Sequence, residues 1–374
     1  MKQVFTSFDS GKVIRFVCIA WIITKLVSYK LWLANRLFPL VPVHESLSLL
    51  PPVVHTVLFV ISICTMLFLL IFPNKKIALL ILFVELLSCL LDQNRWQPWE
   101  YQFIFMLAVY IYYRDEKHLR LGWQIILAGI YFFGGLSKLN SAFIHDIWQG
   151  LMLRRWLGIS PPGIWLTRAG YALPVIEMAA AVCLYVVSTR RMAIWILALM
   201  HVMIILMFGP VGLNTNLGIL PWNVLMPVLL FILFYNGSFQ PITDFTVKPF
   251  SYVILLCWWV LPWLQLGGYW DKYLSAVLYG GGVEQLFICT DNALAKEQLA
   301  PYFDKEFKVI PCKPVLAVYK WGIMEMNIAY YPEKRVYNAI IKEWNKRYPD
   351  GSNKFYLYRS GFNYKVREVL QEGN

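Results

Sequence analysis

Lys138 is the first candidate for chemistry in this chain, because it interrupts an otherwise apolar sequence. It follows the apolar stretch 122–133 through Gly134 and Gly135. An ammonium group at the edge of a hydrocarbon-length helix costs free energy, and such groups usually face a bundle interior or a polar cavity. Desolvation also disfavours the charged form of a lysine, so a buried lysine gives up its proton more readily. Lys138 is therefore a candidate for chemistry; the alternative is that its long side chain only extends outward to the membrane interface.

The composition is that of an integral membrane protein. The chain is 59% hydrophobic and 15% charged, whereas a soluble globular domain carries about 25% charged residues. The sequence predicts a polytopic α-helical membrane protein, with about nine transmembrane segments in residues 1–268. A full span needs about 20 residues, so two of the nine windows are short. The apolar windows lie near 13–33, 51–72, 77–91, 101–113, 121–139, 171–187, 192–211, 221–236 and 250–267.

The basic residues are distributed unevenly between alternate connections, and this asymmetry predicts an orientation. The chain has a formal net charge of +12, and basic residues concentrate on the cytoplasmic side of membrane proteins. This pattern places the N-terminus in the cytoplasm and, with nine spans, the C-terminal part outside it; it does not favour nucleic-acid binding. The poorer set of connections holds Arg36, Arg95, Arg154, Arg155 and Arg168. The richer set holds Lys2, Lys12, Arg15, Lys75, Lys76, Arg114, Lys117, Arg120, Arg190, Arg191 and Lys248.

Residues 269–374 differ in composition and predict a small extracytoplasmic α+β domain. Short β-like runs occur at 285–290, 307–310, 315–321 and 354–358. The segment 334–348 predicts an amphipathic helix, because its apolar residues recur at helical spacing. Those residues are Val336, Ile340, Ile341 and Trp344.

The seven cysteines of the chain show no CxxC or Cys/His spacing, so no metal site is predicted. In an oxidising compartment Cys289 and Cys312 could form a disulfide. Two unpaired cysteines in the core of the C-terminal domain are an equally good interpretation.

Several ionisable residues at membrane depth are predicted to gather around Lys138. With a rise of 1.5 Å per residue, Glu177 falls roughly 9 Å below the outer face that Lys138 approaches. Asp92 ends an outward segment at that face, and His201 lies beneath it near the middle of the membrane. Each also has a purely structural interpretation: Asp92 as a helix cap and His201 as a hydrogen-bonded packing residue. Lys25 is predicted to form a structural ion pair with Glu85 or another acid.

The segment 131–140, Tyr-Phe-Phe-Gly-Gly-Leu-Ser-Lys-Leu-Asn, is followed by Trp148. It resembles a signature of the vitamin K-dependent gamma-carboxylase superfamily, whose bacterial members are called horizontally transferred transmembrane (HTTM) domain proteins. Weaker resemblances are Leu91-Asp92 with Trp96 and Tyr101, and His201 ahead of the break at 208–210. The chain departs from the carboxylases at Ser137, which often corresponds to a second lysine, and its C-terminal part is much smaller than theirs.

The resemblance implies a function and a set of site residues. In the carboxylases a lysine at the position of Lys138 is the base that acts on a reduced naphthoquinone of the menaquinol or vitamin K type. From their predicted depths in the membrane, Glu177, His201 and Asp92 would support Lys138 in catalysis. The residues that would contact the cofactor are Tyr131, Gly134, Gly135 and Asn140.

The sequence thus predicts a quinone-dependent membrane enzyme, with the bilayer, a lipid quinone and a secreted or envelope peptide as its partners. Two other functions remain open. One is a non-enzymatic scaffold or assembly factor, whose C-terminal domain binds an envelope protein. The other is a transporter of a lipid or small molecule, in which the buried charges form the substrate path.

Overall fold

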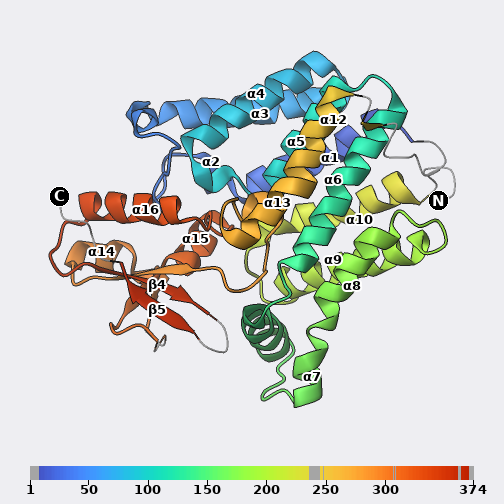
Figure 1. Cartoon of the computed structure of the whole chain (residues 1–374). Coiled ribbons are helices and arrows are strands. Elements are labelled where there is room, and N and C mark those ends of the chain that lie inside the picture. The colour runs from blue at the N-terminus through green and yellow to red at the C-terminus, as the bar shows by residue number, and fades with distance from the viewer. Residues whose placement is uncertain are drawn as a thin grey trace.

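The computed structural model describes residues 8–235, 245–246, 248–305, 307, 309–360 and 364–369. A bundle of helices occupies most of the chain, and a small antiparallel sheet with flanking helices follows it (Figure 1). The helices of the bundle are α1 Ser10–Val27, α2 Tyr29–Trp32, α3 Val53–Ile71, α4 Lys75–Leu91, α5 Pro98–Tyr112, α6 Glu116–Leu136, the π-helix η4 Phe143–Trp156, α7 Ile164–Ala169, α8 Ala172–Cys183, α9 Arg190–Phe208, α10 Leu220–Phe234, α12 Pro249–Leu255, the π-helical turn η6 Leu256–Val260 and α13 Leu261–Leu264.

Six helical segments are long and apolar enough to cross a membrane, as in a multi-pass membrane protein. Their outer faces are apolar and exposed, as lipid-facing surfaces are, with Val224 56% exposed and Leu199 62% exposed. The six segments are Val53–Ile71, Glu116–Leu136, Ile164–Cys183, Arg190–Phe208, Leu217–Phe234 and Pro249–Gly267.

The predicted number of nine spans is not confirmed. Every predicted window falls on a helix, but α1 contains Lys12, Arg15 and Lys25 within its 18 residues. Helices α4 and α5 have 17 and 15 residues, and an untilted span needs about 20. Whether α1, α4 and α5 cross the membrane therefore stays a prediction.

The N-terminal end of α1 and the C-terminal part of the chain lie at opposite ends of the bundle (Figure 1). At one end, Ser10 Oγ donates to Glu116 Oε1 over 2.7 Å, and Arg120 Nε donates to the carbonyl of Leu233 over 2.8 Å. At the other end, Asn327 Nδ2 donates to the carbonyl of Val27 over 2.9 Å. The described residues of the basic-rich set lie toward the Ser10 end, whereas Lys2 lies outside the described residues. Which end faces the cytoplasm remains a prediction.

The C-terminal part is a five-stranded antiparallel sheet in the order β2-β3-β1-β4-β5. The predictions of β1, β4 and the amphipathic helix α16 are confirmed, and Val336, Ile340, Ile341 and Trp344 are all buried. The elements are β1 Gln285–Cys289, α14 Ala293–Gln298, β2 Phe303–Asp304, β3 Val315–Ala317, α15 Val318–Met326, α16 Lys334–Arg347, β4 Lys354–Arg359 and β5 Lys365–Glu368.

Two of the predicted strands are wrong in extent or place. The run 315–321 is a strand only as far as Ala317, after which α15 begins, because Val318, Trp321 and Met326 recur at helical spacing and are buried together. The described residues of 307–310 form no strand; β2 lies just before them and pairs with β3. Strand β5 was not predicted, since its largely exposed residues carry little apolar periodicity.

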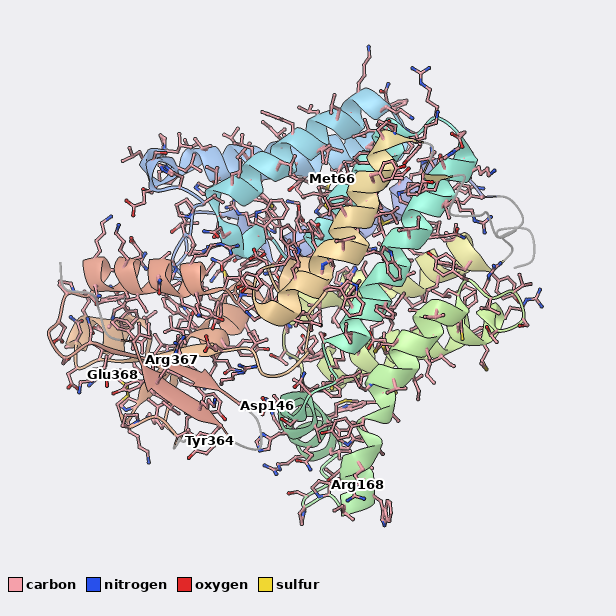
Figure 2. All side chains as sticks on the ribbon, in the orientation of Figure 1. Met66, Asp146, Arg168, Tyr364, Arg367 and Glu368 are labelled. Carbon is pink, nitrogen blue, oxygen red and sulfur yellow. A yellow bond between two sulfur atoms is a disulfide. The ribbon has the colours of Figure 1, made fainter. Side chains whose placement is uncertain are left out.

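The C-terminal part packs directly on the end of the bundle. The Glu325 carboxylate accepts hydrogen bonds from the backbone N–H groups of Leu37 and Phe38, at 2.6 and 2.9 Å. The ring of Phe38 lies 4.9 Å from that of Trp321. Figure 2 shows Asp146 of η4 where the bundle meets the sheet that carries Arg367 and Glu368. One hydrophobic core runs through both parts, so their relative position is held by packing.

Cys289 and Cys312 form a disulfide, so of the two interpretations of these cysteines, a disulfide or two unpaired core thiols, the first holds. We expect Cys289→Ala/Cys312→Ala to destabilise the sheet by about 3 kcal/mol, because the bond closes a loop with a sequence separation of 23. The measurement is hydrogen–deuterium exchange of β1 and β4. The control is Cys64→Ala, which removes an exposed free thiol; equal protection in wild type and the double variant would contradict the expectation.

Asp271 lies at the junction of the two parts, and we expect its contact with Arg335 and Tyr331 to be sensitive to acid. Burial opposes its ionisation, but hydrogen bonds from Arg335 and Tyr331 outweigh burial and lower the pKa of the carboxyl. A pKa lower in the folded than in the unfolded chain stabilises the fold above about pH 4, and this contribution is lost as the pH falls through the folded-state pKa. We expect Asp271→Asn to cost about 1 kcal/mol at neutral pH. In thermal unfolding at a series of pH values, this difference from wild type should close in acid; a constant difference would disprove it.

Candidate functional site

Lys138 and Glu177 meet at one end of the bundle, as predicted. Lys138 follows the last turn of α6, and its Nζ lies 2.6 Å from Oε2 of Glu177 on α8. The two side chains are 17% and 7% exposed, so the ion pair is largely withdrawn from solvent yet not sealed. A pair in such surroundings interacts more strongly than one on a protein surface, because less water screens the charges.

The two glycines before Lys138 bring α6 and α8 together. A Cβ atom on Gly135 would lie 2.7 Å from Met178 Cγ and 2.8 Å from the carbonyl oxygen of Pro174, so this position requires glycine. A Cβ atom on Gly134 would lie 3.0 Å from Oε1 of Glu177. Gly135 thus serves helix packing, while Gly134 leaves room beside the ion pair.

His201 and Tyr131, both predicted site residues, belong to a hydrogen-bonded chain with Asn223. Nδ2 of Asn223 donates to the carbonyl of Ile219 over 2.9 Å, which orients the amide so that its Oδ1 accepts. His201 Nδ1 lies 2.8 Å from this Oδ1 and therefore carries the proton. Nε2 of His201 then accepts from the hydroxyl of Tyr131 over 2.9 Å. Both ring nitrogens are engaged, so His201 positions Tyr131, one turn of α6 before Gly135.

Asn140 ties the end of α6 to the loop 276–282. Its Nδ2 donates to the carbonyls of Ser137 and Gly280, both over 2.7 Å. Its Oδ1 accepts from the backbone N–H of Phe143 over 2.9 Å. These bonds give the amide of Asn140 a structural role, and its cofactor contact stays a prediction.

Asp92 does not join the other predicted site residues, and the expected four-residue cluster is corrected in this respect. Its Oδ2 lies 2.5 Å from Nη2 of Arg36, and its Oδ1 accepts from Nδ2 of Asn94 over 2.9 Å. The backbone N–H of Val41 also donates to Oδ1, over 3.2 Å. Asp92 therefore holds the segment after α2 against the end of α4, the capping role that was its structural alternative.

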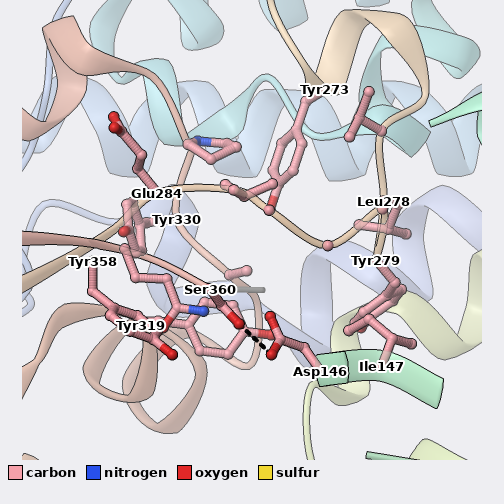
Figure 3. Close-up of a pocket in the computed structure, with 18 of the residues that line it drawn as sticks. Asp146, Ile147, Tyr273, Leu278, Tyr279, Glu284, Tyr319, Tyr330, Tyr358 and Ser360 are labelled. Carbon is pink, nitrogen blue, oxygen red and sulfur yellow. Dashed lines mark hydrogen bonds between the residues drawn. The ribbon is translucent and has the colours of Figure 1, made fainter. Parts of the chain in front are cut away.

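A cavity of about 310 Å³ lies at the junction of the bundle and the sheet (Figure 3). The hydroxyl of Ser360 donates to the carboxylate of Asp146 at its edge. Burial raises the pKa of Tyr319 to about 12 and that of Tyr273 above its ordinary value, so these hydroxyls are protonated donors at neutral pH. Six aromatic residues line the cavity: Tyr273, Tyr279, Phe307, Tyr319, Tyr330 and Tyr358.

The loop 276–282 separates this cavity from the Lys138–Glu177 pair. Residues 277–282 line the cavity, while a Cβ atom on Gly280 would lie 3.0 Å from the carbonyl oxygen of Ser137. The carbonyl of Ala276 would be 3.8 Å from a Cβ atom on Gly134. The ion pair and the cavity thus lie on two sides of one short loop.

Sequence reasoning missed the tyrosines of the cavity and Asn223. Asn223 could have been found as an amide inside an apolar run, where an unsatisfied polar group is costly. The tyrosines come from distant segments and share no sequence pattern. Among the described residues, no group of three His, Cys, Asp or Glu side chains could hold a metal ion.

Comparison with known proteins does not extend this description. No family model matches the chain, and neither the curated proteins nor the solved structures include a match.

Proposed function

We propose that this chain is a membrane enzyme in which Lys138 removes a proton from a bound substrate, with a reduced naphthoquinone as its cofactor. The observation that carries the proposal is the distance of 2.6 Å between Lys138 Nζ and Glu177 Oε2 in a largely buried position. The resemblance of residues 131–140 to the vitamin K-dependent gamma-carboxylases supports the same chemistry.

Glu177 can convert Lys138 into a base. In the ion pair the proton lies on Nζ; its transfer to Oε2 leaves a neutral amine and a neutral carboxylic acid. The free lone pair of Nζ then accepts a proton from the bound molecule. Glu177 gives its own proton to the leaving product or to water, which restores the ion pair.

The junction cavity fits a flat aromatic hydroquinone. Its volume of about 310 Å³ is at the lower end of the range for small-molecule sites. Tyrosine rings offer flat apolar faces, and their protonated hydroxyls can bond the two oxygens of a hydroquinone. Tyr273, Tyr319 and Tyr330 would hold the ring system there, and the loop 276–282 would have to shift for Lys138 to reach the bound molecule. When bound, the reduced naphthoquinone supplies the electrons for reaction with oxygen.

The apolar outer surface of the bundle offers a route for a lipid cofactor. An apolar groove of about 440 Å³ runs between α1 and α10, with Phe16, Ile23 and Leu217 among its lining residues. Leu217 directly follows Asn216, which lines the junction cavity. A polyprenyl tail in the groove would therefore end next to the aromatic walls that would receive the head group.

Oxygen uptake by the purified protein tests the proposal. In lipid nanodiscs with a naphthohydroquinone, the wild-type protein should consume oxygen faster than empty nanodiscs do. A rate equal to that blank, with no quinone in the lipid extract of the protein, would disprove the enzymatic function. The scaffold and transporter hypotheses would then be tested by partner capture on the C-terminal part and by substrate flux.

A further inference from the structure

A second group of ionisable side chains lies inside the bundle, apart from Lys138 and its partners. Lys25 of α1, Glu85 of α4 and Glu100 of α5 are each 0% exposed. Nζ of Lys25 lies 2.7 Å from Oε2 of Glu85, and the hydroxyl of Ser62 donates to Oε1 of the same carboxylate. Glu85 therefore has a cation and a hydroxyl donor, as a buried carboxylate requires.

Glu100 has no such partners. Its Oε2 accepts from Nε1 of Trp21 over 2.7 Å, but its Oε1 has no hydrogen-bond partner among the described residues. Glu85, on the neighbouring helix α4, is also fully buried. Two carboxylates cannot bond to each other, since both are acceptors, whereas one carboxylic acid donates to a carboxylate.

The nearest cations are already engaged. Lys25 bonds to Glu85. The guanidinium of Arg95 donates to the carbonyls of Leu31, Trp32 and Ser88, to the Ser88 hydroxyl and to His55 Nδ1. All five of these acceptors are neutral groups. The guanidinium of Arg95 is therefore hydrogen-bonded elsewhere and does not form an ion pair with Glu100.

Among the described residues, the other elements packed against α5 bring no cation to Glu100. From α4 comes the buried thiol of Cys89, and from the turn Tyr273–Ser275 the hydroxyl of Tyr273. The charged residues of α6 lie between Glu116 and Arg120, in its first turns. Those turns are at the Ser10 end of the bundle, away from the first turn of α5 that holds Glu100.

We infer that Glu100 is a carboxylic acid and that it shares its proton with Glu85, so that Lys25, Glu85 and Glu100 form a proton-binding site inside the bundle. The ligand of this site is the proton itself. With it, the three groups carry one positive and one negative charge; without it, an uncompensated negative charge would be buried, at a cost of several kcal/mol. The site joins α1, α4 and α5, and it does not depend on the function proposed for Lys138.

Infrared spectroscopy of the full-length protein in nanodiscs tests this inference, since a carboxylic acid shows a C=O stretching band that an ionised carboxylate lacks. At neutral pH the wild-type protein should show such a band with a deuterium shift, and Glu100→Gln should lose it. Glu333→Gln is the control: it removes a carboxylate that pairs with Lys272 outside the bundle, so the band should persist. Glutamine has the shape of a protonated glutamate, so Glu100→Gln should change Tm by less than about 3 °C.

Three outcomes would overturn the inference. The first is a band that Glu100→Gln leaves unchanged. The second is a failure of Glu100→Gln to fold, because the neutral isostere should be tolerated where the native side chain is neutral. The third is a band that disappears in sodium chloride and returns in choline chloride at the same pH, which would make a sodium ion the ligand.

Discussion

Lys138→Met is expected to lower hydroquinone-dependent oxygen uptake by at least about 100-fold, the smaller end of the range for general-base catalysis. Methionine has nearly the length of the lysine stem but no lone pair of comparable basicity, and it leaves the packing of α6 on α8 unchanged at Gly135. Glu177→Gln should also reduce the rate strongly, because an amide cannot take the proton from Nζ. The measurement is the initial rate at saturating hydroquinone.

Lys342→Met is the matched control for these two variants. Lys342 pairs with Glu45 over 2.5 Å, but the side chains are 69% and 82% exposed and lie away from the cavity. This variant should retain the wild-type rate. Near-wild-type turnover by Lys138→Met, with an unchanged Tm, would show that Lys138 is not the base.

Lys25→Met is expected to destabilise the protein by about 3–5 kcal/mol, the usual cost of leaving one partner of a buried ion pair unpaired. Its ammonium group lies 2.7 Å from Glu85 and 3.1 Å from the ring centroid of Trp32, with no exposed surface. Removing it leaves Glu85 with the hydroxyl of Ser62 but no cation. Thermal unfolding in nanodiscs, followed by tryptophan fluorescence, measures the loss.

A double variant separates loss of the charge pair from loss of packing. Lys25→Met/Glu85→Gln removes both charges, and it should recover most of the stability that Lys25→Met loses, because buried ion pairs can often be replaced by neutral groups. Lys342→Met should cost less than about 1 kcal/mol, since its ion pair is exposed. If Lys25→Met were as stable as Lys342→Met, the pair with Glu85 would have no structural importance.

Local sequence signals predicted the elements whose structure depends on neighbouring residues alone. The apolar windows are all helical, because long apolar stretches in a membrane must satisfy their backbone groups internally. Helix α16 was predicted from the spacing of Val336, Ile340 and Trp344, which are all buried. The need of Lys25 for an acidic partner also followed from sequence, since a charge in an apolar helix needs a partner, and the structure shows that this partner is Glu85.

Tertiary contacts decided most of the candidate site. Asp92 and Glu177 have the same charge and similar predicted depth, but Arg36 lies beside one and Lys138 beside the other. His201 of α9 is held between Tyr131 of α6 and Asn223 of α10. No sequence rule predicts that these two helices pack beside α9.

By itself, the sequence determined the helical membrane class, the change of composition near residue 269 and the two buried lysines that need acidic partners. These follow from the free-energy cost of placing polar groups in a low-dielectric interior. That cost depends on the type of the residue and not on its neighbours in the fold. Only the tertiary structure decided which acid meets which lysine, how the tyrosines enclose a cavity, and that Glu100 lacks a cation. Those facts depend on distances between residues far apart in the chain, where a change of a few ångströms makes or breaks a hydrogen bond.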